Sequence, residues 1–438
     1  MNASPAVLST CSRERGDSIG QPASGTLLWT AQTARSGPPL RIVFLIPRLH
    51  IGGVQRQLCL LACGLRAAKD RVLVATLVPG GEFLHEFRKA AIPVVVLGDG
   101  ERPSPRLLSR LLRLLDCERP DILYSYLPSA NILSALAKAL RPETRLVWGL
   151  RLTSRETGRD GLPHRLVARA ERSLRSKSDM LIANAPSVRS AAITAGFPAP
   201  RVRVIPNGFD PDRFRFDWNK RQRLRRAWGV TDGLQLIGVV GRLDVMKGHE
   251  VFLEAARHLA GADPKLRFVC VGPDYDGRQA ALEAHSRGLG ISELVSWPGP
   301  ASDMAAVYSA LDLLCQASIF GEGFPNSVTE ALLCGLPCVG TDVGHTRELL
   351  SGIGSVVPVR DPHALAAACR DVLSRSAGER RADGGRARER IAREFPAEAM
   401  VAATSSALRD LARPLRAFQT SPSPEQVPSV SVRPGARA

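Results

Sequence analysis

Two cations in the second half of the 438-residue chain have a spacing that suits the binding of an anion. Arg242 and Lys247 lie five residues apart in GRLDVMKGHE (241–250), which follows the apolar run LQLIGVV. Gly241 permits a tight turn after that run, and a helix is expected to begin directly afterwards. Two positive side chains beside a helix N-terminus form a good site for a diphosphate. A surface loop with two solvated charges is the alternative interpretation.

Two carboxylates follow in the segment ASIFGEGFPNSVTEALLCGLPCVGTDVG (317–344), where seven residues separate Glu322 from Glu330. We expect GFPN to form a turn and SVTEALLCG to begin a helix, whose free backbone N–H groups favour anions or sugar hydroxyls. Glu322 would lie on the loop and Glu330 in the first two turns of the helix. The pair could hold hydroxyls on two parts of one ligand. Helix capping would explain either carboxylate alone, but not the whole arrangement.

A pair of glycines, Gly52 and Gly53, follows the continuous apolar run RIVFLIP (41–47) and is expected to begin a helix. Backbone N–H groups at such a point can approach a phosphate closely. Ordinary turn chemistry explains the two glycines equally well.

The elements that must position these residues alternate between apolar strands and amphipathic helices, which predicts doubly wound α/β domains. The charged stretch FRFDWNKRQRLRRAWGV (214–230) interrupts the alternation. We therefore predict a first Rossmann-like domain at 39–215, a second at 220–396 and a closing helix at 397–417. The segments 1–38 and 418–438 are rich in small residues or in Pro and Ser, and are predicted to be disordered tails.

The positive charge of the chain is concentrated in its first half. Residues 1–220 hold 33 Lys and Arg against 18 Asp and Glu, a balance of +15, whereas residues 221–438 hold 26 against 24, a balance of +2. A basic face attracts nucleic acid, an anionic membrane or an anionic substrate. Arg-rich composition with solvated side chains is the alternative. No aromatic-rich RNA-binding motif or zinc finger accompanies the charge, so no nucleic-acid partner is expected.

Composition excludes several other classes of protein. No run approaches the length of a transmembrane helix, and the N-terminus lacks the pattern of a secretory signal. Nine scattered cysteines without a CxxC pair fit a reducing cytoplasm and make a zinc site improbable. The expected location is therefore the cytoplasm or, through peripheral attachment, the inner face of the membrane.

As a set, these segments resemble glycosyltransferase family 4, the large family of retaining enzymes with the GT-B fold. The matching segments, in order, are the glycine-pair loop, VIPNGFD (204–210), GRLDVMKG and EGFPNSVTEALLCGLPCV. The resemblance covers roughly residues 40–415. It implies two Rossmann-like domains facing across a cleft, with the C-terminal helix closing back on the N-terminal, acceptor-side domain.

The resemblance also implies a role for each matching residue. Arg242 and Lys247 would bind the donor diphosphate and stabilise the leaving group, and Glu330 would hold the ribose hydroxyls. Glu322 would contact the transferred sugar, aided by backbone groups of Gly323, Phe324 and Pro325. Gly52 and Gly53 would approach the phosphates, and Asn207 and Gly208 would shape the connection between domains.

One position departs from the family. Many members carry His after the strand that matches DILYSYL (121–127), near the transferred sugar, and Tyr126 stands there in this chain. Tyr can still donate a hydrogen bond, so Tyr126 is a candidate for the sugar side of the site.

Asp274 and Asp276 resemble the metal motif of a different glycosyltransferase fold, but we expect them to cap a helix. No metal or other cofactor is expected, because positive side chains can neutralise the diphosphate.

The expected function is retaining transfer of a sugar from a nucleotide-diphosphate sugar to a hydroxyl of a lipid-linked or polysaccharide glycan, in cell-surface polysaccharide biosynthesis. An alternative is a non-catalytic GT-B subunit that partners a glycosyltransferase. An epimerase of the same fold should lack both the cation pair and the carboxylate pair, and a nucleic-acid-binding protein would explain only the charge.

Overall fold

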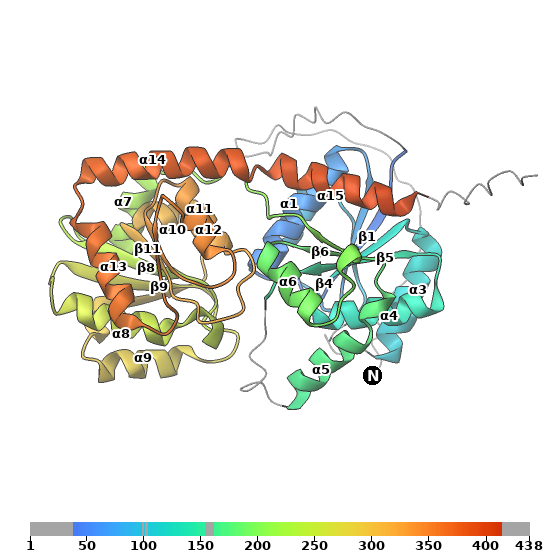
Figure 1. Ribbon diagram of the computed structural model, residues 1–438, viewed down its shortest axis with the longest axis horizontal. Coiled ribbons are helices and arrows are strands. Elements are labelled where there is room, and N and C mark those ends of the chain that lie inside the picture. Colours follow the sequence, from blue (N-terminus) through green and yellow to red (C-terminus); the bar gives the residue numbers. More distant parts are fainter. Residues whose placement is uncertain (1–37, 99, 101–103, 154–161, 414–438) are drawn as a thin grey trace, which may run out of the picture. The chain divides into compact units, whose positions relative to one another are not determined.

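The computed structural model describes residues 38–98, 100, 104–153 and 162–413. Apart from residue 38, the tails expected at 1–38 and 418–438 lie outside these residues. The described chain forms two parallel sheets with helices packed on them, each built from its own half of the sequence (Figure 1).

The first sheet has seven parallel strands in the order β3-β2-β1-β4-β5-β6-β7. Its strands are continuous apolar runs because helices cover both faces. The strands are β1 (Arg41–Ile46), β2 (Arg71–Thr76), β3 (Val94–Val96), β4 (Ile122–Tyr126), β5 (Arg145–Leu150), β6 (Met180–Ala183) and β7 (Val202–Val204). The helices are α1 (Gly53–Ala67), α2 (Leu84–Lys89), α3 (Pro105–Glu118), α4 (Pro128–Leu140), α5 (Leu162–Ser173) and α6 (Pro186–Thr194), with short 3-10 turns η1 (Arg175–Lys177) and η2 (Ala199–Arg201).

The second sheet has six parallel strands in the order β10-β9-β8-β11-β12-β13. The strands are β8 (Gln235–Val240), β9 (Leu266–Val271), β10 (Val295–Gly299), β11 (Leu313–Gln316), β12 (Cys338–Thr341) and β13 (Ser355–Val357). The helices are α7 (Trp218–Ala227), α8 (His249–Ala260), α9 (Gln279–Gly288), α10 (Met304–Ala310), α11 (Asn326–Leu333), α12 (Thr346–Leu350) and α13 (Pro362–Ser374), with 3-10 turns η3 (Val245–Lys247) and η4 (Ser292–Leu294).

Each face of the second sheet has its own buried core, because successive side chains of a strand point to opposite faces. Ile237 of β8 belongs to the cluster covered by α8, α9 and α13, whereas its neighbour Leu236 belongs to the cluster covered by α10, α11 and α12 (Figure 1). Burial on both faces explains why the sequence shows unbroken apolar runs here rather than alternation.

Both sheets reverse their strand order at one point, and the candidate site residues follow the strands that flank these points. In the first sheet the reversal lies between β1 and β4, which precede Gly52 and Leu127 respectively. In the second it lies between β8 and β11, which precede Gly241 and Ala317. Ligands of open α/β sheets bind beyond the carboxyl ends of strands at such points.

The charged stretch at 214–230 forms α7, which packs against α10. Arg221 and Arg225 of this helix both hold the carboxylate of Asp312, at 2.7 and 3.0 Å, and Asp312 also accepts the backbone N–H of Leu236 at 2.7 Å. These two cations therefore fix the starts of β8 and β11 instead of facing solvent.

The last two helices, α14 (Ala377–Glu394) and α15 (Ala397–Ala412), pack against different halves of the chain. Helix α14 packs on α11, and α15 packs on α1 of the first half. Between them, Phe209 exchanges two backbone hydrogen bonds with Phe395 and Ala397, both at 2.9 Å. A β-carbon on Gly208 would lie 2.7 Å from the Cα of Ala397. Glycine is therefore needed at position 208, where the segment around Phe209 lies against the start of α15.

These observations confirm the predicted fold class, with two Rossmann-like sheets and a C-terminal helix that returns to the first. No helix in the described ranges is long and apolar enough to cross a membrane.

Candidate functional site

The loop after β8 holds its two cations against carboxylates. Arg242 donates its Nε to Asp244 Oδ2 at 2.9 Å, and its Nη2 lies 2.6 Å from the same oxygen. Asp244 Oδ1 in turn accepts the backbone N–H of Lys247 at 3.1 Å and so caps the turn η3. Gly248 adopts φ of 64°, and a β-carbon there would lie 2.0 Å from the carbonyl oxygen of Ala317. A glycine is therefore required where the two loops of the site meet.

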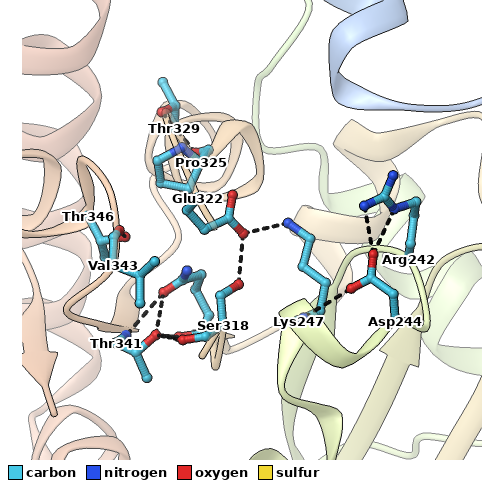
Figure 2. A network of polar contacts seen from close by, with 11 residues as sticks. Arg242, Asp244, Lys247, Ser318, Glu322, Pro325, Thr329, Thr341, Val343 and Thr346 are labelled. Carbon is cyan, nitrogen blue, oxygen red and sulfur yellow. Dashed lines mark hydrogen bonds and ion pairs between the residues drawn. The ribbon is translucent and has the colours of Figure 1, made fainter. Parts of the chain in front are cut away.

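Lys247 reaches from this loop to the loop after β11, where its Nζ donates to Glu322 Oε1 at 2.6 Å (Figure 2). Ser318 Oγ donates to the same oxygen at 2.7 Å, and the hydroxyl of Thr341 donates to the carbonyl oxygen of Ser318. Glu322 is only 5% exposed. Burial alone would raise the pKa of Glu322, but the charge and hydrogen bonds of Lys247 and Ser318 outweigh it and hold the pKa below its usual range.

The backbone around Glu322 is fixed on both sides. Glu322 forms an antiparallel bridge with Leu152, which follows β5. The N–H of His345 donates to the carbonyl oxygen of Gly323 at 2.9 Å, and a β-carbon on Gly323 would lie 2.6 Å from the carbonyl oxygen of Arg151. The next residue, Phe324, is buried against Phe209, Phe395 and His345. Pro325 then precedes the first residue of α11.

Glu330 lies one and a half turns into α11 and is 2% exposed. Its Oε1 accepts Nη1 of Arg56, which lies on α1, and its Oε2 accepts the hydroxyl of Tyr308 on α10 at 2.8 Å. Both carboxylate oxygens therefore have protein donors, and one donor comes from the other half of the chain.

The glycine pair lies at the start of α1, with Gly52 as the N-cap residue and Gly53 as the first helical residue. Asn326, the first residue of α11, donates its Nδ2 to the carbonyl oxygen of Gly53 at 3.2 Å. Its Oδ1 accepts Nδ2 of Asn207 at 2.7 Å. The N-termini of α1 and α11, which the sequence suggested as ligand sites, are thus connected through the side-chain amide of Asn326.

Tyr126, the last residue of β4, is completely buried. Its ring stacks on Tyr124 with centroids 4.6 Å apart, and the guanidinium of Arg151 lies 5.1 Å from its ring centre. Its hydroxyl accepts Arg151 Nη2 at 3.4 Å. Burial raises the pKa of Tyr126, although Arg151 acts in the opposite direction. Leu127, which follows, has φ of 71°, an unusual conformation for a non-glycine residue.

Asp274 behaves as the sequence predicted for a capping residue. Its two carboxylate oxygens accept the backbone N–H groups of Arg278 and Gln279 at 2.8 and 2.9 Å, at the start of α9. These hydrogen bonds lower its pKa, led by the bond from Gln279. Within the part of the chain that the structure describes, no group of three or more His, Cys, Asp or Glu side chains could hold a metal ion.

The structure thus brings Arg242, Lys247, Glu322 and Gly241 together around the end of the second sheet, and places Glu330 at the other end of the same loop and helix. Sequence reasoning did not single out Asp244, Ser318 or Tyr308, whose roles depend on packing. It also missed Arg56, although this residue stands only three positions after Gly53 in the glycine-pair segment.

Models of two protein families match the chain, one in each half. The model of the family described as Glycosyltransferase Family 4 matches residues 51–213, and that of the family described as Glycosyl transferases group 1 matches residues 235–375.

Two curated relatives match parts of the chain. It is 34% identical over 258 residues to D-inositol 3-phosphate glycosyltransferase of Geodermatophilus obscurus, a match that covers 55% of this chain and 56% of that protein. It is 31% identical over 204 residues to 2-deoxystreptamine glucosyltransferase of Streptomyces kanamyceticus, which covers 45% of this chain and 51% of that protein. The chain therefore spans about half the length of the curated relatives it matches.

Solved structures share the fold. HepE from Anabaena, crystallised in complex with UDP-glucose, superposes with a TM-score of 0.74 at 24% identity, covering 85% of this chain and all of that one. WaaG, a glycosyltransferase involved in lipopolysaccharide biosynthesis, superposes with a TM-score of 0.64 at 17% identity, covering 84% and 99%. The two family matches, the relatives and the shared architecture lead to one conclusion: the chain belongs to the group 1, family 4 glycosyltransferases, which have the GT-B fold.

Proposed function

We propose that the chain is a retaining glycosyltransferase that moves a sugar from a nucleotide-diphosphate sugar to an acceptor hydroxyl. The observation that carries this proposal is the pairing of Lys247 with the buried Glu322 beside Arg242, at the point where the strand order of the second sheet reverses. A cation for a leaving diphosphate and a carboxylate for sugar hydroxyls stand next to each other there. Family membership supports the reaction class.

Arg242 and Lys247 stabilise the diphosphate as it leaves. The ammonium group of Lys247 has three donors and uses one of them on Glu322, while Arg242 uses Nε and Nη2 on Asp244. The remaining N–H groups bind phosphate oxygens. When the bond between the anomeric carbon and the phosphate oxygen breaks, the electron pair goes to the diphosphate, whose charge these fixed cations stabilise. We therefore propose catalysis without a divalent metal.

The carboxylates bind the two ends of the donor. Glu322, with backbone groups of Gly323, Phe324 and Pro325, contacts the transferred sugar, and Glu330 accepts the ribose hydroxyls. Gly241 turns the backbone under the diphosphate, and the glycine pair approaches it from the first half of the chain. The acceptor hydroxyl attacks from the face that the leaving group vacates, which gives retention, as the family resemblance implies.

The acceptor in this proposal is a lipid-linked or polysaccharide glycan of the cell surface, bound by the first Rossmann-like unit. The relatives named above carry different acceptors in their names, so family membership alone does not choose among them. Tyr126 remains the candidate on the sugar side, and its hydroxyl would act together with Arg151, which covers it.

The basic surface of the first unit would bring the protein to the inner face of an anionic membrane. Helix α5 exposes Leu166, Arg169 and Arg172, and α4, which packs against it, exposes Leu136 and Leu140. Exposed apolar and basic side chains on two neighbouring helices suit an anionic bilayer, to which each cation adds about 1 kcal/mol. Among the other arginines between residues 151 and 175, Arg155, Arg159 and the side chain of Arg165 lie outside the described residues. Arg175 is half-buried, and Arg151 belongs to the site around Tyr126.

Turnover of a donor panel tests the transferase proposal. UDP-, ADP- and GDP-linked hexoses are incubated with the protein, starting with UDP-glucose because HepE binds it, and release of the nucleoside diphosphate is followed. We expect release with at least one donor, and loss of release in the Lys247→Ala variant. Nucleotide binding without turnover of any donor and acceptor would favour the non-catalytic subunit instead.

Co-sedimentation with vesicles tests the membrane proposal separately. Binding to anionic vesicles at low salt, lost at high salt and absent with neutral lipid, is the expected result. Equal pelleting with both lipids, or none with either, would leave the charge as a matter of composition.

A further inference from the structure

The carboxylate of Glu330 is held by two side chains that are far from it in the sequence. Arg56 Nη1 donates to Oε1, and the Tyr308 hydroxyl donates to Oε2 at 2.8 Å. The Glu330 side chain is 2% exposed and that of Arg56 is 17% exposed. Burying a carboxylate costs free energy unless a cation and hydrogen bonds compensate for its lost hydration. Arg56 is the cation that does so here.

The two protein donors leave Glu330 with unused capacity. A carboxylate has about four lone-pair positions, and Arg56 and Tyr308 occupy one on each oxygen. The group is therefore fixed in orientation while two positions remain for hydroxyl donors of a ligand. Arg56 also keeps a buried Nε–H for which the described residues provide no acceptor. Such a group is costly without a partner, which fits a place beside a polar ligand.

We infer that Arg56 is a positioning residue for nucleotide recognition, which holds the Glu330 carboxylate in the orientation that accepts the ribose hydroxyls. The inference rests on the proposed binding of a nucleotide-sugar donor and on the proposed contact of Glu330 with ribose. Because Arg56 lies on α1 of the first Rossmann-like unit and Glu330 on α11 of the second, the affinity for the nucleotide depends on both units.

Calorimetry with UDP, ADP and GDP and their 2′,3′-dideoxy counterparts tests this role. Wild-type protein should bind at least one ribonucleotide more tightly than its dideoxy form. Arg56→Gln should raise the Kd for that ribonucleotide about 10- to 100-fold, the usual effect of losing a hydrogen bond to a charged group. It should leave the Kd for the dideoxy form unchanged, because that ligand makes no bond to Glu330. Arg56→Lys should recover part of the loss.

Arg66→Gln is the matched control, since Arg66 is an exposed arginine on the same helix. It should bind both forms as the wild type does. An equal rise in Kd for both nucleotide forms in Arg56→Gln, or no rise for either, would show that Arg56 has only a structural role and overturn the inference.

A double variant covers the case in which Arg56→Gln leaves Glu330 unpaired and unfolds the protein. Arg56→Gln combined with Glu330→Gln removes both charges, and it should bind the ribonucleotide no more weakly than Glu330→Gln alone. An additional loss of affinity would contradict action through Glu330. The proposed function fails in a different way: wild-type protein would then bind none of the three nucleotides. Equal wild-type binding of ribo and dideoxy forms would contradict the inference but leave donor binding intact.

Discussion

Glu322 and Glu330 are both buried and belong to one loop–helix segment, but they are neutralised differently. Glu322 pairs with Lys247, which lies in the adjacent loop of the same sheet, and with Ser318, four residues away. Glu330 pairs with Arg56, 274 residues away on the first unit, and with Tyr308. The first pair can form within one Rossmann-like unit, whereas the second requires both units to be folded and in contact.

This difference suggests that the two carboxylates bind different parts of the donor. A carboxylate that shares its loop junction with the diphosphate cations is suited to the reacting end of the donor, where charge develops. A carboxylate held from both units is suited to recognition of the nucleotide. Removing one partner of each glutamate at a time tests this difference.

Replacing Lys247 by Met should have the largest effect, on stability. It leaves Glu322 buried without its cation, which costs about 3–5 kcal/mol of unfolding free energy at pH 7. In the wild type the lowered pKa of Glu322 adds stability that is present above the unfolded-state pKa and is lost as the pH falls through the lower folded value. In the variant, burial dominates and the folded pKa rises above the unfolded one, so the deficit should shrink as the pH falls toward about 4.

Urea unfolding of wild type and variant between pH 5 and 8 measures this deficit. Lys265→Met, which removes an exposed lysine of the same half, is the control and should cost little at any pH. A deficit that does not change with pH would contradict the assigned charge state of the Lys247–Glu322 pair.

Replacing Arg242 or Lys247 by Ala should lower kcat about 100-fold or more, by analogy with the loss of one preorganised group that stabilises developing charge. Steady-state kinetics with the donor found in the panel provide the measurement, and circular dichroism checks that the variants are folded. Near-normal turnover in both variants would refute their role at the diphosphate.

The two glutamates themselves should separate in kinetics. Glu322→Gln should mainly lower kcat, because it acts at the transferred sugar, whereas Glu330→Gln should mainly raise the KM for the donor, about 10- to 100-fold, by weakening a hydrogen bond to ribose. If both variants change kcat and KM in the same proportion, the proposed division between reaction and recognition is wrong.

Chelation should have no effect. Because Arg242 and Lys247 take the place of a metal ion in neutralising the diphosphate, turnover should survive EDTA. Loss of activity on chelation, restored by Mn²⁺ or Mg²⁺, would contradict this prediction. Asp274 and Asp276 would then become candidate metal ligands, although Asp274 caps α9 in the structure.

The amino-acid sequence alone determined the architecture of the two sheets. Continuous apolar runs such as RIVFLI and QLIGVV are typical of strands covered on both faces, and both runs form such strands. The same holds for local relationships within loops: Asp274 caps the helix that follows it, and Glu330 lies in α11 as its spacing predicted. These features depend on neighbours a few residues apart, which spacing defines.

Contacts between residues far apart in the sequence became evident from the folded structure alone. Nothing in the order of residues places Arg56 on Glu330, Asn207 on Asn326 or Arg151 over the ring of Tyr126. Tyr126 illustrates the limit best, because the sequence suggested it for the sugar side of the site, yet its ring at the end of β4 is packed under Arg151 and against Tyr124. Such pairs form because the sheets bring the ends of distant strands and helices together, and the side chains there must then satisfy one another's charge and hydrogen bonds away from water.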